Sequence, residues 1–314
     1  MDHANAGRTQ LLSFESRDWD DELLSCFGVP KSVLPEPRPT QYEFGNLAGT
    51  NIPILVCQGD QTAAGFGYGN LPFGTAHVNL GTGGFMLAPV DDLEILRAQE
   101  KMPLLISLAN STVNEAEYFI EGTINGAGAA IKWAAEKLDI ESVEKNLDRW
   151  AESVVEPPLF FNAVAGIGSP IWNSSPPQSL ANRWFDQELN PIATPAPEKA
   201  MVGVLESVAF LIKMNLDSMC ELEVCISKFR ITGGVAKSNA ICQRLADLSK
   251  CQIIQPSESE STLLGIACLL GDHAGESDNN WLSDENFGKV FTPRHNPILE
   301  QRYDLFQSLI QRSG

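Results

Sequence analysis

The sequence predicts an α/β protein, because strand-like and helix-like patterns alternate along most of its 314 residues. The strand-like patterns are short apolar runs that end at glycine or at polar residues. The helix-like patterns are longer and repeat apolar residues every three or four positions. A chain of this length is typical of two domains, and it also allows one large α/β domain.

Two short helices and a glycine hairpin are expected in the first part of the chain. Asp18 can cap a helix that Gly28 ends, and four prolines then favour an extended connection. A hairpin is expected where two apolar runs flank consecutive glycines. In order, we expect a helix over residues 18–28, the extended connection over 30–39, a buried strand over 52–57, a helix of small residues over 62–67, and strands over 76–80 and 85–88.

The rest of the chain continues this alternation. Its clearest unit is a strand followed by Gly-Gly, a helix, a second strand and a second helix, an order typical of α/β proteins. In order, we expect a strand over 117–121, helices over 129–138 and 141–154, a strand over 157–161, a surface loop over 173–197, a long helix over 198–221, a strand over 228–232, a helix over 238–248, a strand over 252–255, a helix over 261–270, a polar acidic tail over 274–290, and a last helix over 298–311.

The composition excludes several classes of protein. Hydrophobic residues make up 43 % of the chain, which is enough for a sizeable core, so wholesale disorder is excluded. The formal net charge of −18 argues against a nucleic-acid partner and against binding to an anionic membrane surface. A nucleotide ligand stays open, because local dipoles and a metal ion hold such a ligand rather than the net charge.

The chain carries no signal for a membrane or for an oxidising compartment. No run of about 18 apolar residues occurs, and the polar, acidic start is unlike a signal peptide. The seven cysteines are scattered and most lie in apolar runs, so we expect buried, reduced thiols in a cytoplasmic protein. The four histidines lack ligand spacing, which argues against a histidine-based metal site.

A carboxylate stands where one strand is expected to end. Asp60 and Gln61 follow the apolar run of residues 52–57. In open α/β sheets, ligands bind beside the carboxyl ends of strands. There, Asp60 can take a proton from a substrate hydroxyl, and Gln61 can hydrogen-bond a polyol. The alternative is that Asp60 only caps the following helix, as aspartate often does.

Two glycine turns have the composition of phosphate-binding turns. The turn of residues 81–84 can expose backbone N–H groups and the Thr82 hydroxyl to an anion. Gly233-Gly234 stands between a strand and a helix that begins near Ser238, so phosphate can approach the backbone there. The second turn matches neither the dinucleotide nor the Walker pattern. The alternatives are an ordinary hairpin for the first turn and close strand–helix packing for the second.

Taken in order, these segments resemble the FGGY family of carbohydrate kinases, most closely its glycerol-kinase-like branch. Each motif is weak alone, whereas eight motifs in the same order and with similar spacing are specific. The resembling segments are residues 2–9 (family pattern D-x-T-N-A-S-R-T), 19–24, 59–61, 81–85 (G-T-G-x-F), 121–133 (E-G-x-x-x-x-A-G-x-x-I-Q-W), 166–172 (G-L-x-A-P-x-W), 233–239 (G-G-x-x-x-N) and 260–265 (E-x-T-A-L-G).

The resemblance implies an actin-like ATPase fold built of two ribonuclease-H-like domains, with the nucleotide in the cleft between them. It implies transfer of the γ-phosphoryl group of ATP, with Mg²⁺, to a hydroxyl of a sugar or polyol. Asp60 would be the catalytic base, and Asp60, Gln61 and Phe85 would contact the substrate. The implied nucleotide contacts are Thr82, Gly83, Gly128, Lys132, Gly234 and Ser238, and no metal ligand is assigned.

The chain also departs from the family pattern. Lys132 stands where the pattern has Gln, Ser238 where it has Asn, and Thr232 where an acidic residue is usual. Residues 183–200 lack the G-x-x-x-G-L core of the family's second signature. A whole segment of the family, with a first phosphate loop and most residues that select the substrate, precedes the position of Met1.

We therefore expect residues 1–72 to be the end of an amino-terminal domain and residues 73–314 to be a carboxy-terminal, nucleotide-binding domain. Two functions follow from this expectation. The first is a carbohydrate kinase with little activity alone, which acts as a homo-oligomer or with a complementary amino-terminal half. The second is a nucleotide- or partner-binding fragment that transfers no phosphoryl group. A dehydrogenase is disfavoured, because G-x-G-x-x-G is absent from the sequence.

Overall fold

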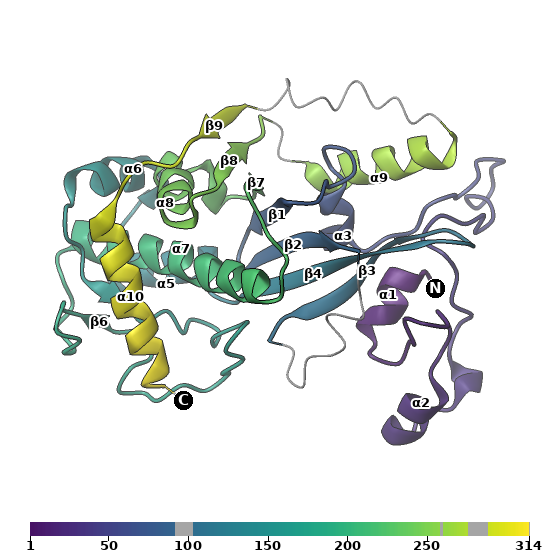
Figure 1. Cartoon of the computed structure of the whole chain (residues 1–314), viewed down its shortest axis with the longest axis horizontal. Helices are drawn as coiled ribbons and strands as arrows, with labels where there is room; N and C mark the ends of the chain where they lie inside the picture. Colours follow the sequence, from purple (N-terminus) through teal and green to yellow (C-terminus); the bar gives the residue numbers. More distant parts are fainter. Residues whose placement is uncertain (92–102, 258–259, 276–287, 314) are drawn as a thin grey trace.

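The computed structural model of the chain describes residues 1–91, 103–257, 260–275 and 288–313. A seven-stranded mixed sheet in the order β3-β4-β2-β1-β7-β8-β9 forms its centre (Figure 1). The strands of this sheet are β1 (Thr75–Leu80), β2 (Gly84–Val90), β3 (Leu105–Ser111), β4 (Ala116–Ile124), β7 (Lys228–Thr232), β8 (Gln252–Gln255) and β9 (Lys289–Phe291). A separate pair consists of β5 (Leu159–Phe160) and β6 (Trp184–Phe185).

Helices cover both faces of the sheet. The long helix α7 lies on one face with α5, α6, α8 and α10, and α3 and α9 lie on the other (Figure 1). The helices are α1 (His3–Arg8), α2 (Asp21–Phe27), α3 (Asp60–Gly65), α5 (Gly128–Lys137), α6 (Val143–Ser153), α7 (Pro197–Glu221), α8 (Asn239–Ser249), α9 (Ser261–His273) and α10 (Pro297–Gln311), with short 3₁₀ turns at η1 (Lys31–Val33) and η2 (Val235–Lys237).

The direction of the strands determines where a site can form. β1 pairs in parallel with β7, and β7 in parallel with β8, so the carboxyl ends of these three strands meet at one edge of the sheet. The pairs β1–β2, β2–β4 and β3–β4 are antiparallel, and so is β8–β9 at the other end of the sheet. Turns that follow β1 and β7 are therefore neighbours in space although about half of the chain separates them.

Alternating side chains along β2 divide the core into two parts. Met86 and Ala88 point into the larger core, which α7 fills, whereas Leu87 lies in the smaller core under α3 and α9. The contact between α3 and α9 is made at Gly265, where a Cβ atom would overlap the carbonyl oxygen of Ala63. This close approach places the beginning of α9 against the beginning of α3, and Thr262 Oγ1 donates to the carbonyl oxygen of Asp60 at 3.2 Å.

The amino-terminal segment has a small core of its own and is joined to the sheet by an ion pair. Leu12, Trp19 and Leu24 are buried in this core. Arg8 Nη2 lies 2.8 Å from a carboxylate oxygen of Glu121, a buried residue of β4. An ion pair with one partner withdrawn from water is costly to break, because removal of Arg8 would leave a buried, unpaired carboxylate.

Most of the elements expected from the sequence are confirmed. The α/β class is confirmed, as are the glycine hairpin of β1 and β2, the strands β7 and β8, and the helices α5 to α10 to within three residues at their ends. Gly28 ends α2 in the left-handed conformation, with φ +66°. Asp20 caps this helix instead of Asp18, so α2 begins at Asp21. The strands β3 and β9 were not expected.

The predicted buried strand over residues 52–57 is wrong. This segment makes only isolated bridges to residues 41 and 46, and Ile52 is 60 % exposed. Pro53 has no N–H group to donate to a ladder, so the apolar run forms an irregular hairpin arm. The extended connection over residues 30–39 also contains the short turn η1.

The surface loop predicted over residues 173–197 is partly wrong, because β6 lies within it. Trp184 is fully buried and stacks on Trp133 of α5, with ring centroids 5.9 Å apart. A third aromatic ring, that of Phe160 of β5, packs against Trp184, with ring centroids 5.1 Å apart. Proline, serine and asparagine are abundant in this segment, and they mask a strand that needs only two residues.

The prediction of buried cysteines is correct for only part of the set. All seven thiols are free; Cys242, Cys251 and Cys268 are buried, and Cys26, Cys220 and Cys225 are exposed. Burial raises the pKa of Cys242 to about 12, which keeps this thiol protonated and unreactive. None of the helices in the described ranges is long and apolar enough to cross a membrane. Most of the predicted acidic tail, residues 276–287, lies outside the described residues.

The α3–α9 contact predicts that Gly265→Ala destabilises the fold. The added methyl group must push α9 away from the backbone of α3, and overpacking of this kind costs about 1–3 kcal/mol. Urea unfolding followed by circular dichroism measures the loss as a lower midpoint. Gly234→Ala is the matched control, because a Cβ atom at Gly234 meets no other atom within 4 Å. Equal midpoints for the two variants would contradict the packing argument.

Candidate functional site

A cavity of about 850 Å³ opens where β1 and β7 end. Three parts of the chain wall it: the turn between β1 and β2, the helices α5 and α6, and the turn that leads from β7 to α8. Five of the six residues that the sequence assigns to nucleotide binding line this one cavity, namely Thr82, Gly128, Lys132, Gly234 and Ser238. Its volume is in the range of small-molecule sites.

The β1–β2 turn is locked to the start of α5. The backbone N–H groups of Gly128 and Ala129 donate to the carbonyl oxygens of Gly81 and Thr82, both at 2.9 Å. A Cβ atom at Gly128 would lie 2.6 Å from the carbonyl oxygen of Gly81, so only glycine permits this approach. The first backbone N–H groups of α5 therefore hold the β1–β2 turn in place. The Thr82 hydroxyl remains beside the cavity.

The two glycines after β7 have different roles. Gly233 has φ +97°, and a Cβ atom there would overlap the backbone of Leu80 at the end of β1. Gly233 thus allows the two strand ends to lie together. Gly234 has ordinary helical backbone angles and open space on its Cβ side. A ligand in the cavity can therefore reach the backbone at Gly234.

The amino terminus of α8 is occupied by a side chain of the protein. Asp148 of α6 accepts hydrogen bonds from the Ser238 hydroxyl and, at 3.2 Å each, from the N–H groups of Asn239 and Ala240. The carboxylate takes the place that an anion would have at the positive end of this helix. The β1–β2 turn is consequently a better binding place for a phosphate group than the amino terminus of α8, whose donors are already occupied.

Sequence reasoning missed Asp148, since 90 residues separate it from Ser238 and no local pattern marks it. Asp148 borders the cavity together with Val143 and Leu147 from the same helix. Ile131, Trp133 and Val235 add further apolar surface. An aromatic base fits such a wall, because stacking and apolar burial need no charge.

Lys132 is a flexible member of the cavity wall. Its ammonium group lies 3.9 Å from Glu136, one helical turn further along α5, and both side chains are largely exposed. Exposed pairs of this kind contribute little to stability. Lys132 is therefore free to turn towards a phosphate group.

The residues assigned to the substrate lie elsewhere. Asp60 is the first residue of α3 and is exposed, and one of its carboxylate oxygens accepts from the N–H of Gln61 at 2.8 Å. Phe85, at the start of β2, is half-buried. Asp60, Gln61 and Phe85 do not line the 850 Å³ cavity, and neither does Gly83, which packs against the backbone of Ile124.

The backbone before Asp60 is held from two sides. Gln58 Nε2 donates to the carbonyl oxygen of Ala109 in β3 at 2.6 Å, and Gln58 Oε1 accepts from the N–H of Gly59 at 2.9 Å. On the other side Asp2, which is buried, accepts from Asn5 Nδ2 at 2.7 Å, and Asn5 lies against Gly59. Asp60 is thus exposed on a fixed piece of backbone, as a group that must meet a substrate should be.

Metal ligation is not evident from side chains alone. Within the ranges that the structure describes, no three His, Cys, Asp or Glu side chains gather closely enough to hold a metal ion. Mg²⁺ in phosphoryl-transfer sites is held mainly by the substrate phosphates and by one or two carboxylates. A cluster of three protein ligands is therefore not required for a nucleotide-bound Mg²⁺ ion.

Family models match both parts of the chain. The model of the carboxy-terminal domain of the FGGY family of carbohydrate kinases matches residues 76–271, and the model of the amino-terminal domain matches residues 1–67. A glycerol kinase of Bacillus velezensis is 32 % identical over 302 residues, which cover 93 % of this chain and 59 % of that protein. A glycerol kinase of Haloferax volcanii is 30 % identical over 328 residues, covering 99 % of this chain and 61 % of that protein.

Solved structures share the fold. A glycerol kinase of Plasmodium falciparum with ADP superimposes with a TM-score of 0.84 at 23 % identity, over all of this chain and 63 % of that chain. A ligand-bound xylulose kinase of Lactobacillus acidophilus superimposes with a TM-score of 0.79 at 19 % identity, over 99 % of this chain and 63 % of that one. The expected actin-like ATPase fold is confirmed by these neighbours. The chain spans less than two thirds of the length of each relative.

The cap on α8 predicts that Asp148→Ala destabilises the turn after β7. Loss of the carboxylate leaves one hydroxyl and two amide donors without their acceptor, and loss of a helix cap costs about 1–2 kcal/mol. Urea unfolding measures this cost. Glu144→Gln, which changes an exposed carboxylate on the same helix and the same cavity wall, should leave the midpoint unchanged. A loss of stability of equal size in both variants would contradict the capping role.

Proposed function

We propose that this chain, which belongs to the FGGY family of carbohydrate kinases, provides the nucleotide site and the catalytic base of an ATP-dependent kinase for a sugar or polyol. The observation that carries the proposal is the convergence of both glycine turns and the start of α5 on one cavity. We assign the nucleotide site to residues 73–314 and the base to the segment 1–72. Because ATP is the phosphoryl donor, we also propose a cytoplasmic location.

The cavity walls suggest how ATP lies. The base of the nucleotide rests on the apolar surface of α5 and α6, which includes Trp133 and Leu147. The phosphates run towards the β1–β2 turn, where Thr82 donates its hydroxyl and Gly83 brings the backbone close. Gly234 admits the ligand to the backbone on the opposite wall, and Lys132 adds a positive charge. Mg²⁺ carried with the phosphates neutralises their charge.

Asp60 acts on the acceptor and not on the nucleotide. As the acceptor oxygen bonds to the γ-phosphorus, its proton passes to the Asp60 carboxylate, and the bond from phosphorus to the departing ADP oxygen breaks. Gln61 hydrogen-bonds the acceptor, and Phe85 packs beside it. This division of labour agrees with the position of Asp60 outside the nucleotide cavity. The relatives favour a small polyol such as glycerol.

A second function is supported by the extent of the match. The chain spans 59 % of the Bacillus velezensis relative and 61 % of the Haloferax volcanii relative. Phosphoryl transfer depends on several positioned groups, and loss of one electrostatic element costs about 10²–10³-fold in rate. These 314 residues could therefore bind a nucleotide or a partner without transferring phosphate. The kinase would then require a complementary amino-terminal half or a second copy of the chain.

Turnover by the 314-residue chain separates the two functions. We expect binding of ADP and ATP with little or no ATP turnover in the presence of glycerol, other polyols or ketoses. Calorimetry measures nucleotide binding, and a coupled ADP assay measures turnover. Robust turnover by the isolated chain would overturn the fragment proposal, and the absence of nucleotide binding would overturn the assignment of the nucleotide site.

Asp60→Asn tests the assignment of the base. In whatever assembly shows turnover, the rate of transfer should fall by about 10²–10⁴-fold, because the amide cannot accept the proton. ATP affinity should stay within about twofold, since Asp60 lies outside the nucleotide cavity. Glu22→Gln, an exposed acidic change in the first turn of α2, is the control and should leave both quantities unchanged. Equal rates for Asp60→Asn and the parent would remove Asp60 from this role.

A further inference from the structure

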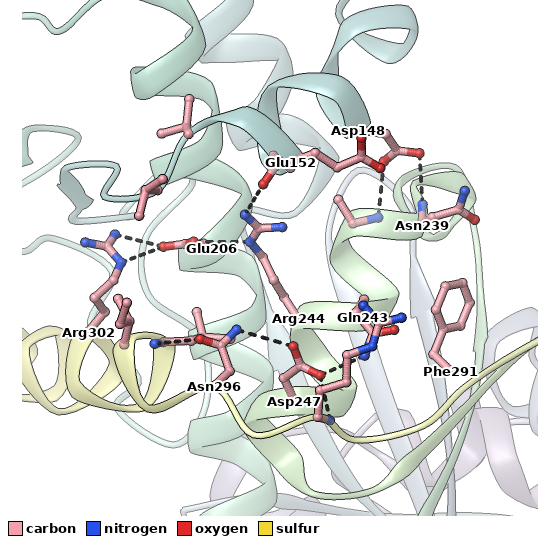
Figure 2. Close-up of a pocket in the computed structure, with 17 residues that line it drawn as sticks. Asp148, Glu152, Glu206, Asn239, Gln243, Arg244, Asp247, Phe291, Asn296 and Arg302 are labelled. Carbon is pink, nitrogen blue, oxygen red and sulfur yellow. Dashed lines mark hydrogen bonds and ion pairs between the residues drawn. The ribbon is translucent and has the colours of Figure 1, made fainter.

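The charged side chains behind α8 are matched to one another within the protein. Glu206 of α7 accepts from Arg244 Nε of α8 at 3.1 Å and from Arg302 Nε of α10 at 2.9 Å (Figure 2). Asp247 of α8 accepts from Gln243 Nε2 at 2.7 Å. These contacts join α7, α8 and α10. Chemically reactive groups that the proposed phosphoryl transfer leaves unused lie further along α7.

Three cysteines lie where α7 ends and β7 begins. Cys220 is in the last turn of α7, Cys225 stands three residues before β7, and Cys251 immediately precedes β8. Cys220 and Cys225 are exposed, whereas Cys251 is buried. Cys251 Sγ donates to the carbonyl oxygen of Ile226 at 3.2 Å. The buried thiol therefore lies beside the residue that follows Cys225.

The turn between Cys220 and Cys225 is fixed by the way the helix ends. The backbone N–H of Val224 donates to the carbonyl oxygen of Met219 at 2.9 Å, and that of Glu223 donates to the carbonyl oxygen of Cys220 at 3.0 Å. These two bonds form a Schellman motif. Glu223 adopts the left-handed conformation that this motif needs, with φ +62°. The chain therefore turns back within the five positions that separate the two cysteines.

The segment that follows the turn is anchored as well. The backbone N–H groups of Ser227 and Lys228 donate to the carbonyl oxygen of Gly74, at 2.8 Å and 3.2 Å. Gly74 directly precedes β1. Cys220 thus stands on a helix, and Cys225 stands on a segment tied to the central sheet. The spacing of the two thiols is therefore set by the fold and not by a free loop.

The two thiols are close enough to act on each other. Burial raises the pKa of Cys220, the backbone N–H of Ile226 partly opposes this rise, and a thiolate at Cys225 adds to it. The Cys220 sulfur thus lies near the N–H of the residue next to Cys225. Because the thiolate is the nucleophile, Cys220 is suited to react second, when an activated sulfur is already beside it.

We propose that Cys220 and Cys225 form a reversible dithiol–disulfide site that reacts with small-molecule disulfides. The Cys225 thiolate first attacks one sulfur of the small disulfide, whose S–S bond breaks, so that a mixed disulfide forms and one thiolate leaves. Cys220 then gives its proton to solvent and attacks the Cys225 sulfur, and the second thiolate leaves. The protein loses two hydrogen atoms, and the two released thiols gain them. This exchange does not depend on the proposed kinase function.

Peptide mass spectrometry on the folded 314-residue chain tests the proposal. The chain is equilibrated with 2-mercaptoethanol and its uncharged disulfide, bis(2-hydroxyethyl) disulfide, then quenched with acid, alkylated and digested with trypsin. Cleavage after Lys213 and Lys228 releases residues 214–228, which contain Cys220 and Cys225 and no other cysteine. We expect this peptide to lose two hydrogen atoms and to carry neither an alkyl group nor mercaptoethanol.

A synthetic peptide of residues 214–228 is the reference without the fold. In the same buffer, the ratio of disulfide to dithiol should be higher in the folded chain by about tenfold or more, because the fold raises the effective concentration of one thiol at the other. Cys26 is the internal control, since it is exposed on α2 and its tryptic peptide has no second cysteine. Cys26 should hold only a mixed disulfide with mercaptoethanol.

Two variants test the order of the steps and the pairing. Cys220→Ser removes the second nucleophile, so mercaptoethanol should stay attached to Cys225. Cys251→Ser keeps a hydrogen-bond donor in place of the buried thiol, and the bond between Cys220 and Cys225 should still form. The proposal fails if the tryptic peptide keeps two thiols or two adducts, if Cys220 is joined to Cys251 instead, if Cys220→Ser leaves Cys225 unmodified, or if the folded chain forms the bond no more readily than the synthetic peptide.

Discussion

The parallel pairing of β1 with β7 is the contact on which the proposed nucleotide site depends. It runs in register from Thr75 opposite Lys228 to Asn79 opposite Thr232, so both strands end at the same level. His77 of β1 also contacts β7, since its Nε2 lies 3.4 Å from the Thr232 hydroxyl. Burial, and then the charge of Arg230, lowers the pKa of His77 to about 4, which keeps the imidazole neutral. Gly233 then lets the backbone of the second turn lie against the end of β1. The two turns that wall the cavity follow directly from these strand ends, and α5 is hydrogen-bonded to the first of the turns.

Packing on the two faces of the sheet separates the proposed nucleotide cavity from Asp60, the proposed base. The face under α7 carries α5, α6 and α8, which wall the cavity, whereas the opposite face carries α3 with Asp60 at its beginning. The position of Asp60 depends on Gly265, because a larger residue would move α9 away from α3. Asp60 and the cavity walls are thus carried by elements that packing holds in place.

Local patterns in the sequence predicted more than long-range contacts. The glycine turns, β7, β8 and α7 were predicted because each has a short signal of its own. The contacts of Asp148 with Ser238 and of Glu206 with Arg244 and Arg302 were missed, because these partners lie 38 to 96 residues apart and charged residues on helices are usually solvated. The strand expected over residues 52–57 failed for the opposite reason: its apolar residues gave a strand signal, but the segment pairs with residues 40–47 only through isolated bridges, and Ile52 and Ile54 stay exposed. For the site, the sequence supplied the glycines and the family resemblance, and the structure supplied the cavity.

The β1–β7 junction also has a consequence for how the chain folds. His77 and Thr232 are 155 residues apart, whereas β1 with β2 and β3 with β4 are joined through short or moderate separations. Contacts between distant segments form slowly, since the entropy of closing a long loop must be overcome first. Hairpins on the β1 side can therefore assemble while the carboxy-terminal third is still being synthesised. The edge of β1 that pairs with β7 stays unpaired until β7 has been synthesised. The nucleotide cavity is then among the last features to form, and a nascent chain would acquire affinity for its ligand only when most of its length is folded.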